Sequence, residues 1–109
     1  MSDNYPISKK LEPAITRLVE GLKPESIYLF GSQARGEASS DSDFDLLIVI
    51  PQSNLPRHQR ETKSYDLLWG LTTPVDLVVL TREEFNRTSQ VKTSLASNVK
   101  DYGRILYNG

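Results

Sequence analysis

Three aspartates stand at the beginnings of two apolar segments. Asp43 and Asp45 flank the start of the run 44–50 (FDLLIVI), and Asp76 has the same place in the run 75–80 (VDLVVL). Residues two apart on a strand project from one face, about 6 to 7 Å apart. Carboxylates held this close repel one another unless a cation lies between them, and their hard oxygen atoms favour Mg²⁺ or Mn²⁺ over zinc or copper. The acids therefore predict a divalent-cation site.

The positions of the acids constrain the topology. Asp45 and Asp76 meet only if their two strands begin at the same edge of a sheet and run parallel, and residues 51–74 are enough for a helical crossover. A short apolar strand at 27–30 brings Gly31 to that edge only if it is antiparallel to its neighbour. We therefore expect an α/β (α+β) fold, a small mixed β-sheet with helices packed against it. Doubly wound parallel sheets bind ligands at the carboxyl ends of their strands, so a Rossmann-like fold is disfavoured.

Apolar spacing and the Pro and Gly residues predict the other elements. The run 44–50 is apolar on both alternating faces, which is typical of a central strand covered on two sides. A last edge strand is expected over 103–107. Three helices are expected. The first begins near Pro13 and ends near Gly21, the second covers 56–69 with Gly70 as C-cap, and the third runs through 88–101. A capping box is expected at 81–84, with Thr81 as N-cap.

The residues after the first strand predict a phosphate-binding turn. Gly31 permits close backbone approach to a ligand, and a short helix opened by Ser32 and running through Arg35 would present free amide donors. A phosphate site beside three acids describes two-metal phosphoryl or nucleotidyl transfer. One ion would hold a triphosphate, and the other would lower the pKa of an acceptor hydroxyl.

The joint motif resembles a known family. Gly31-Ser32, ten intervening residues, Asp43-Phe44-Asp45 and a later strand aspartate, Asp76, are similar to the signature of polymerase-beta-type nucleotidyltransferases. The stretch GSQARGEASSDSDFDLLIV is most similar to the minimal nucleotidyltransferases that serve as antitoxins beside HEPN-domain ribonuclease toxins. The resemblance covers nearly the whole chain and implies a polymerase-beta-like nucleotidyltransferase fold.

The resemblance also implies roles for individual residues. Asp43 and Asp45 would bind two Mg²⁺ ions, with Mn²⁺ as a substitute, and Asp76 would share one ion and help to deprotonate the acceptor. Gly31, Ser32 and Arg35 would hold the nucleotide phosphates. The implied reaction transfers AMP from ATP to a hydroxyl, which in the antitoxin branch belongs to a tyrosine of the partner HEPN toxin.

Composition sets further limits. With 109 residues the chain is expected to form one domain, 1–109, without room for a second substrate domain, so a protein partner and a hetero-oligomer are expected. The net charge of -1 argues against general nucleic-acid binding. The absence of cysteine and of any long apolar stretch favours a cytoplasmic protein that does not enter a membrane.

Alternatives stay open at the level of function. The chain could neutralise its partner by occlusion without catalysis, or act with another chain on a small molecule or RNA. An EF-hand is excluded because Leu46 stands where that loop needs Gly. Haloacid-type phosphatases carry their Asp-x-Asp after a strand rather than before it.

Four basic or titratable residues on the second expected helix, and two aromatic residues near its end, allow two interpretations each. A solvated helix face is favoured over a basic stripe for an RNA-cutting partner, and core or interface packing is favoured over base stacking. The first group is Arg57, His58, Arg60 and Lys63, and the second is Tyr65 and Trp69.

Overall fold

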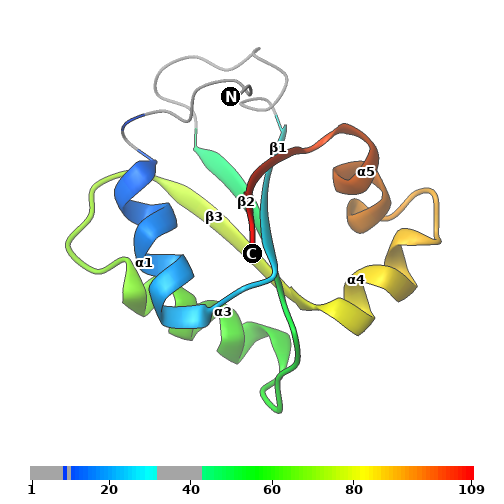
Figure 1. The fold of residues 1–109 in the computed structure, drawn as a ribbon, viewed down its shortest axis with the longest axis horizontal. Coiled ribbons are helices and arrows are strands. Elements are labelled where there is room, and N and C mark those ends of the chain that lie inside the picture. The colour runs from blue at the N-terminus through cyan, green and yellow to red at the C-terminus, as the bar shows by residue number, and fades with distance from the viewer. Residues whose placement is uncertain (1–8, 10, 32–42) are drawn as a thin grey trace.

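The part of the chain that the structure describes folds as a mixed four-stranded sheet with the strand order β3-β2-β1-β4 and helices on both faces (Figure 1). The computed structural model describes residues 9, 11–31 and 43–109. Its elements in chain order are α1 (Glu12–Leu22), β1 (Ser26–Phe30), β2 (Phe44–Ile50), α3 (Arg57–Leu67), β3 (Val75–Thr81), α4 (Arg82–Ser89), α5 (Leu95–Tyr102) and β4 (Arg104–Asn108).

The strand directions confirm the topology inferred from the acids. β2 and β3 are parallel, and β1 is antiparallel to both of its neighbours, β2 and β4. The crossover between β2 and β3 contains α3, as expected for a connection between two parallel strands. β4 forms one edge of the sheet, in agreement with the expected last strand.

β2 is the central strand, and its two faces belong to two separate apolar clusters. Phe44, Leu46, Ile48 and Ile50 pack in the larger cluster with residues of α1, whereas Leu47 and Val49 pack in the smaller one with residues of α4 and α5. Residues 46 to 50 are all buried. The alternation read from the sequence therefore matches the two covered faces.

Gly21 has a role different from the expected one. α1 continues through Gly21 to Leu22, and Lys23 then takes the left-handed backbone conformation, with φ 49°, that ends the helix. A Cβ on Gly21 would lie 2.5 Å from Leu67 Cδ1 of α3. The glycine therefore allows α1 and α3 to pack closely and does not stop the helix.

Two other helix ends also differ from expectation. Leu68, not Gly70, is the C-cap of α3, and Gly70 lies in the turn beyond it with φ 90°. The single helix expected over 88–101 is wrong at its beginning, because the chain leaves α4 after Ser89 and starts again at α5. Ser94 restarts it as an N-cap, accepting a hydrogen bond from Ser97 N–H.

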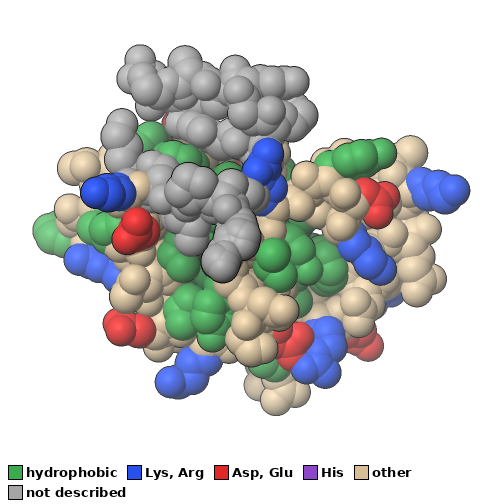
Figure 2. Space-filling view, turned by 45° about the horizontal axis from the view of Figure 1, so that its top comes forward, with side chains coloured by type: hydrophobic (Ala, Val, Ile, Leu, Met, Phe, Trp, Pro, Cys, Tyr) green, Lys and Arg blue, Asp and Glu red, His purple; other side chains and the backbone are tan. Residues whose placement is uncertain are grey.

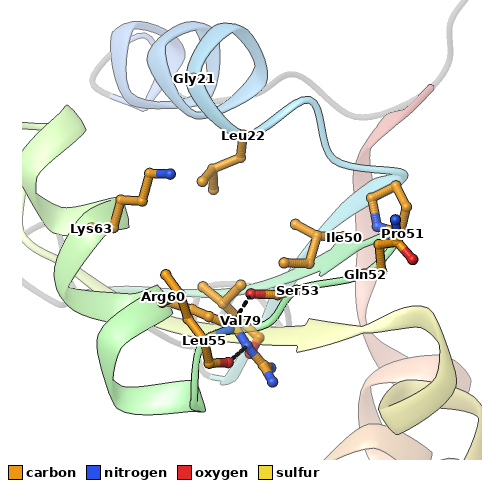
Figure 3. Close-up of a pocket in the computed structure, with 10 residues that line it drawn as sticks. All are labelled: Gly21, Leu22, Ile50, Pro51, Gln52, Ser53, Leu55, Arg60, Lys63 and Val79. Atoms are coloured by element: carbon orange, nitrogen blue, oxygen red, sulfur yellow. Dashed lines mark hydrogen bonds between the residues drawn. The ribbon is translucent and has the colours of Figure 1, made fainter.

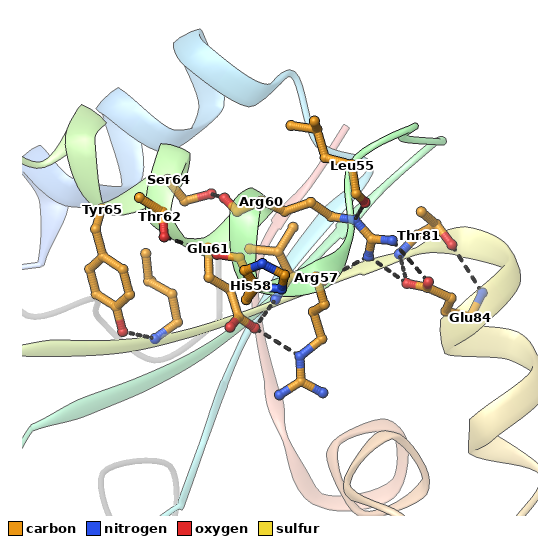
Figure 4. Close-up of polar contacts among 12 residues, drawn as sticks. Leu55, Arg57, His58, Arg60, Glu61, Thr62, Ser64, Tyr65, Thr81 and Glu84 are labelled. Carbon is orange, nitrogen blue, oxygen red and sulfur yellow. Dashed lines mark hydrogen bonds and ion pairs between the residues drawn. The ribbon is translucent and has the colours of Figure 1, made fainter.

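The capping box at the start of α4 is confirmed. Thr81 Oγ1 accepts from Glu84 N–H at 3.1 Å, and Glu84 Oε1 accepts from Thr81 N–H at 2.9 Å. The same glutamate accepts hydrogen bonds from both terminal nitrogens of Arg60, at 2.6 and 2.9 Å (Figure 4). Glu84 thus fastens α3 to the start of α4.

Arg60 fits neither of the two interpretations considered for its helix. Its side chain is buried, and its Nε donates to Leu55 O at 2.8 Å. The paired guanidinium holds the pKa of Glu84 at about 2, the largest cause being the hydrogen bond from Arg60. The spacing of apolar residues along a helix predicts that an arginine faces solvent, and it cannot predict a partly buried ion pair between Arg60 and Glu84.

Within the described ranges, no helix is long and apolar enough to cross a membrane.

Replacing Glu84 is expected to change how stability depends on acidity. The folded pKa of about 2 lies below the unfolded value near 4.5, so the pair stabilises the protein fully above pH 4.5 and is lost as the pH falls through 2. Glu84→Gln should lower the free energy of unfolding at pH 7 by about 3 kcal/mol and flatten its decline between pH 4.5 and 2. Urea unfolding across this range measures both effects.

The matched control is Glu83→Gln, an exposed neighbour on the same helical turn. It should leave both the neutral-pH stability and the acid slope close to wild type. Equal acid slopes for wild type and Glu84→Gln would contradict the assignment.

Candidate functional site

Three strand ends meet at one edge of the sheet. In the β1–β2 register Phe30 pairs with Asp45, and in the β2–β3 register Asp45 pairs with Asp76. The beginnings of β2 and β3 are joined further by a hydrogen bond from Phe44 N–H to Pro74 O at 3.1 Å. Sequence positions 30, 45 and 76 are thereby brought side by side, as the acid pattern predicted.

The paired aspartates lie on the sheet face that α4 and α5 cover farther along. Successive side chains of a strand alternate between faces, so Asp45 shares a face with Leu47, and Asp76 shares a face with Val78. Leu47 and Val78 belong to the smaller apolar cluster. Asp45 is half-buried, while Asp76 and Asp43 are exposed. The acids therefore line the open end of a face whose remainder is packed.

Asp45 is electrostatically unfavourable as an anion. Its pKa is raised, first by burial, then by the charges of Asp76 and Asp43, and last by a side-chain hydrogen bond with Asp76. A hydrogen bond between two carboxyl groups requires a proton on one of them. A bound cation would replace that proton and remove the repulsion, which is the electrostatic condition expected of a metal-binding carboxylate pair.

Gly31 closes the site over Asp45. It has φ 76°, a conformation that favours glycine, and a Cβ added to it would collide with Asp45 Oδ2. The backbone therefore passes directly against the carboxylate. Ser32 and Arg35, the other predicted phosphate contacts, lie outside the described residues.

The donors suit a hard divalent cation that the substrate helps to bind. Among the described residues, no three His, Cys, Asp or Glu side chains form a group positioned to hold a metal ion by themselves. Asp43 adds charge near Asp45 but does not complete such a group. Mg²⁺ characteristically uses one or two carboxylates together with substrate phosphates and water, and the facing pair Asp45 and Asp76 fits that requirement.

The helix that carries Arg57, His58 and Lys63 presents these three side chains to solvent. Arg57 is paired with Glu61 one turn later, its Nε lying 3.0 Å from Glu61 Oε2. On the face turned forward in Figure 2, Lys and Arg side chains stand apart with acidic ones among them. The exposure of Arg57, His58 and Lys63 and the Arg57–Glu61 pair agree with a solvated helix face for these three residues.

A pocket of about 170 Å³ lies at the opposite end of β2, after Ile50 (Figure 3). Gly21, Arg60 and Lys63 are among the residues that line it. Its volume is below the roughly 300 to 1,000 Å³ of most small-molecule sites. We therefore place the candidate site at the acid edge and not in this pocket.

The two aromatic residues near the end of α3 are not core residues. Trp69 is 83% exposed, and Tyr65 is 42% exposed. Tyr65 Oη accepts a hydrogen bond from Leu77 N–H, next to Asp76. Sequence reasoning missed this contact because nothing in the helical pattern says that a hydroxyl will reach the edge of a strand.

Comparisons with known proteins agree on one family. The family model described as "Nucleotidyltransferase domain" matches residues 9–106. The Methanocaldococcus jannaschii protein named "Putative protein adenylyltransferase MJ0604" is 32% identical over 102 residues, covering 88% of this chain and 97% of the relative.

Two solved structures are similar in fold. The chain matches a "toxin-antitoxin with AMP-PNP" with a TM-score of 0.63 and 28% identity, covering 90% of this chain and 73% of that one. A crystal structure named as a "putative nucleotidyltransferase from Sulfolobus solfataricus" matches with a TM-score of 0.65 and 22% identity over 92% of this chain and 78% of that one. At this identity the second likeness bears on the fold alone.

Asp45→Asn is expected to stabilise the metal-free protein at pH 7. The raised pKa of Asp45 means that ionisation is easier in the unfolded chain, so the folded protein loses stability as the pH rises through this titration. The amide removes that penalty. Urea unfolding with and without Mg²⁺ should show that the cation stabilises wild type and has little effect on the variant.

Asp66→Asn is the control, because Asp66 is an exposed carboxylate on α3. Its metal-free stability and its response to Mg²⁺ should match wild type. A response to Mg²⁺ in Asp45→Asn as large as in wild type would contradict the metal role of Asp45.

Gly31→Ala is expected to displace the Asp45 carboxylate and weaken Mn²⁺ binding at least about tenfold, measured by calorimetry. Gly70→Ala is the matched control, because Gly70 also has a positive φ but has open space at its Cβ position. Both variants should lose about 1 kcal/mol of stability to backbone strain. Equal Mn²⁺ affinities for the two variants would show that contact with Asp45 is unimportant.

Proposed function

Because the chain belongs to the nucleotidyltransferase domain family, we propose that it transfers AMP from ATP to a hydroxyl group of a partner protein. The name of the Methanocaldococcus jannaschii relative, a protein adenylyltransferase, supports this choice of donor and acceptor class. The likeness to a toxin–antitoxin structure with AMP-PNP supports an adenine nucleotide as donor.

The observation that carries the proposal is the register pairing of Asp45 with Asp76 under Gly31. Two carboxylates from different strands are held together at cost, and one of them has a raised pKa. Folding alone does not require this arrangement, because asparagine or threonine would satisfy the same strand positions without repulsion. A cation and a nucleotide phosphate account for it.

The reaction needs an acceptor oxygen, a leaving group and a base. The acceptor oxygen attacks the α-phosphorus of ATP, the bond to the bridging oxygen breaks, and pyrophosphate leaves. Asp76 helps to take the hydroxyl proton. Asp43, Asp45 and Asp76 would hold Mg²⁺ or Mn²⁺, which when bound screens the phosphate charges and lowers the pKa of the acceptor hydroxyl. Gly31, with Ser32 and Arg35, would hold the phosphates.

We further propose that the acceptor is a tyrosine of a HEPN-domain toxin, and that the chain acts as the antitoxin of that toxin in the cytoplasm. The motif wording resembles that branch, and the chain is similar to a solved toxin–antitoxin complex. In this scheme the partner supplies the acceptor hydroxyl, and the two proteins form a hetero-oligomer.

The test combines the purified protein, ATP, Mg²⁺ and the product of the neighbouring gene, followed by mass spectrometry of that product. Wild type should add AMP units to a tyrosine. Asp45→Asn and Asp76→Asn should lower the rate at least about 100-fold because each removes a ligand for the cation. Asp66→Asn, exposed on α3, should transfer at the wild-type rate.

Neutralisation in cells separates catalysis from occlusion. If Asp43→Asn and Asp45→Asn protect cells fully although they transfer no AMP, the chain neutralises by binding. An unmodified partner with wild type would overturn the catalytic proposal itself.

A further inference from the structure

Side chains of α3 bind the free edge of β3 (Figure 4). Leu77 N–H donates to Tyr65 Oη at 2.8 Å, and Val79 N–H donates to Glu61 Oε2 at 3.3 Å. Arg60 Nη1 donates to Val79 O at 3.2 Å. Among the described strands, β3 pairs with β2 alone, and the outward amides of an edge strand ordinarily have water or another strand as partners. Here a helix supplies the acceptors.

The repeats of the helix and the strand match. Four residues of an α-helix advance about 6.0 Å, and two residues of a strand advance about 6.6 Å. Glu61 and Tyr65 are four apart on α3, and Val79 and Leu77 are two apart on β3 in the reverse direction. Successive turns of the helix therefore accept from successive outward amides of the strand. The two hydrogen bonds follow from the matching repeats of α3 and β3 and are not independent of each other.

Tyr65 is the contact nearest the candidate site. Its acceptor bond holds Leu77, the residue after Asp76, and Asp76 is the register partner of Asp45. Tyr65 is 42% exposed, so burial alone does not explain a tyrosine there. Asp76 itself is exposed and lies near the beginning of β3. The Tyr65 hydroxyl therefore holds β3 at the residue that follows Asp76.

The other end of α3 is anchored independently. The buried Arg60 binds both carboxylate oxygens of Glu84, at 2.6 and 2.9 Å, and thus ties α3 to the start of α4. Because α3 is fixed at that end, it can hold Tyr65 in a constant position beside the edge of β3. Arg60 and Tyr65 are about one and a half turns apart along α3.

We propose that Tyr65 is a positioning residue for the transfer reaction: its hydroxyl holds the start of β3 so that Asp76 stays opposite Asp45. The inference rests on the proposed function for its catalytic consequence, but its structural consequence can be measured without turnover. Tyr65 touches neither nucleotide nor acceptor in this scheme. It acts through the Leu77 amide.

The test is Tyr65→Phe, which removes one oxygen and keeps the ring. Amide exchange at Leu77, followed by NMR, should accelerate about five- to tenfold because the amide loses its acceptor. Affinity for Mn²⁺, measured by calorimetry, should fall several-fold. In the transfer assay kcat should fall about tenfold while KM for the partner protein stays unchanged, because the substitution removes one oxygen and leaves the exposed part of the ring in place.

Tyr102→Phe is the matched control, because Tyr102 is 73% exposed on α5. It should leave Leu77 exchange, Mn²⁺ affinity and kcat at wild-type values. Unchanged Leu77 exchange or unchanged Mn²⁺ affinity in Tyr65→Phe overturns the positioning role. If wild type itself transfers no AMP, the proposed function fails, and these two measurements still decide whether Tyr65 holds the site.

Discussion

The in-register parallel pairing of β2 with β3 is the constraint on which the site depends, because it forces Asp45 and Asp76 to face each other. Neighbouring strands lie about 4.8 Å apart, and two unit charges at about that separation, in an effective dielectric constant of about 20, would repel by about 3 kcal/mol if both carboxyl groups were ionised. Residues 46 to 50 of β2 are all buried apolar side chains, and each contributes about 1.5 to 3 kcal/mol on burial. Burial of the strand therefore outweighs the repulsion at its first residues, and the core fixes the register that creates the acid pair.

The structure separates chemistry from stability along the length of the sheet. At the amino ends of β2 and β3, the carboxyl groups of Asp45 and Asp76 lie together, and the pKa of Asp45 is raised. At the carboxyl end of β3, Glu84 has a guanidinium partner and its pKa is lowered. The opposite directions of these two shifts distinguish a pair of like charges at one end of the sheet from an ion pair of opposite charges at the other.

Much of this arrangement could be predicted from particular residues. The apolar run after Asp45 predicts a central strand because both alternating faces are apolar, and the shared placement of Asp45 and Asp76 predicts parallel strands. Thr81 and Glu84 predict a capping box by spacing alone. Each of these signals is local, or follows from one geometric requirement.

Other features depend on distant contacts that no local pattern encodes. Gly21 looks like a helix stop, but its meaning comes from Leu67, on another helix. Arg60 looks solvated because its partner is Glu84, 24 positions later. The break between α4 and α5 depends on Ser94, whose hydroxyl also donates to Thr88 O at 2.6 Å. Where a polar helix with few apolar residues begins and ends therefore depends on individual hydrogen bonds of this kind.

The contacts between α3 and β3 also have a consequence for assembly. Leu77 and Val79 already have acceptors for their outward amides, so an incoming strand from another molecule would find no donors free at those positions. β4 occupies the other margin of the sheet and pairs with β1 along its inner side. The two edges of the sheet therefore differ. The contacts with α3 disfavour the addition of a further strand beside β3. They do not oppose the addition of a strand beside β4.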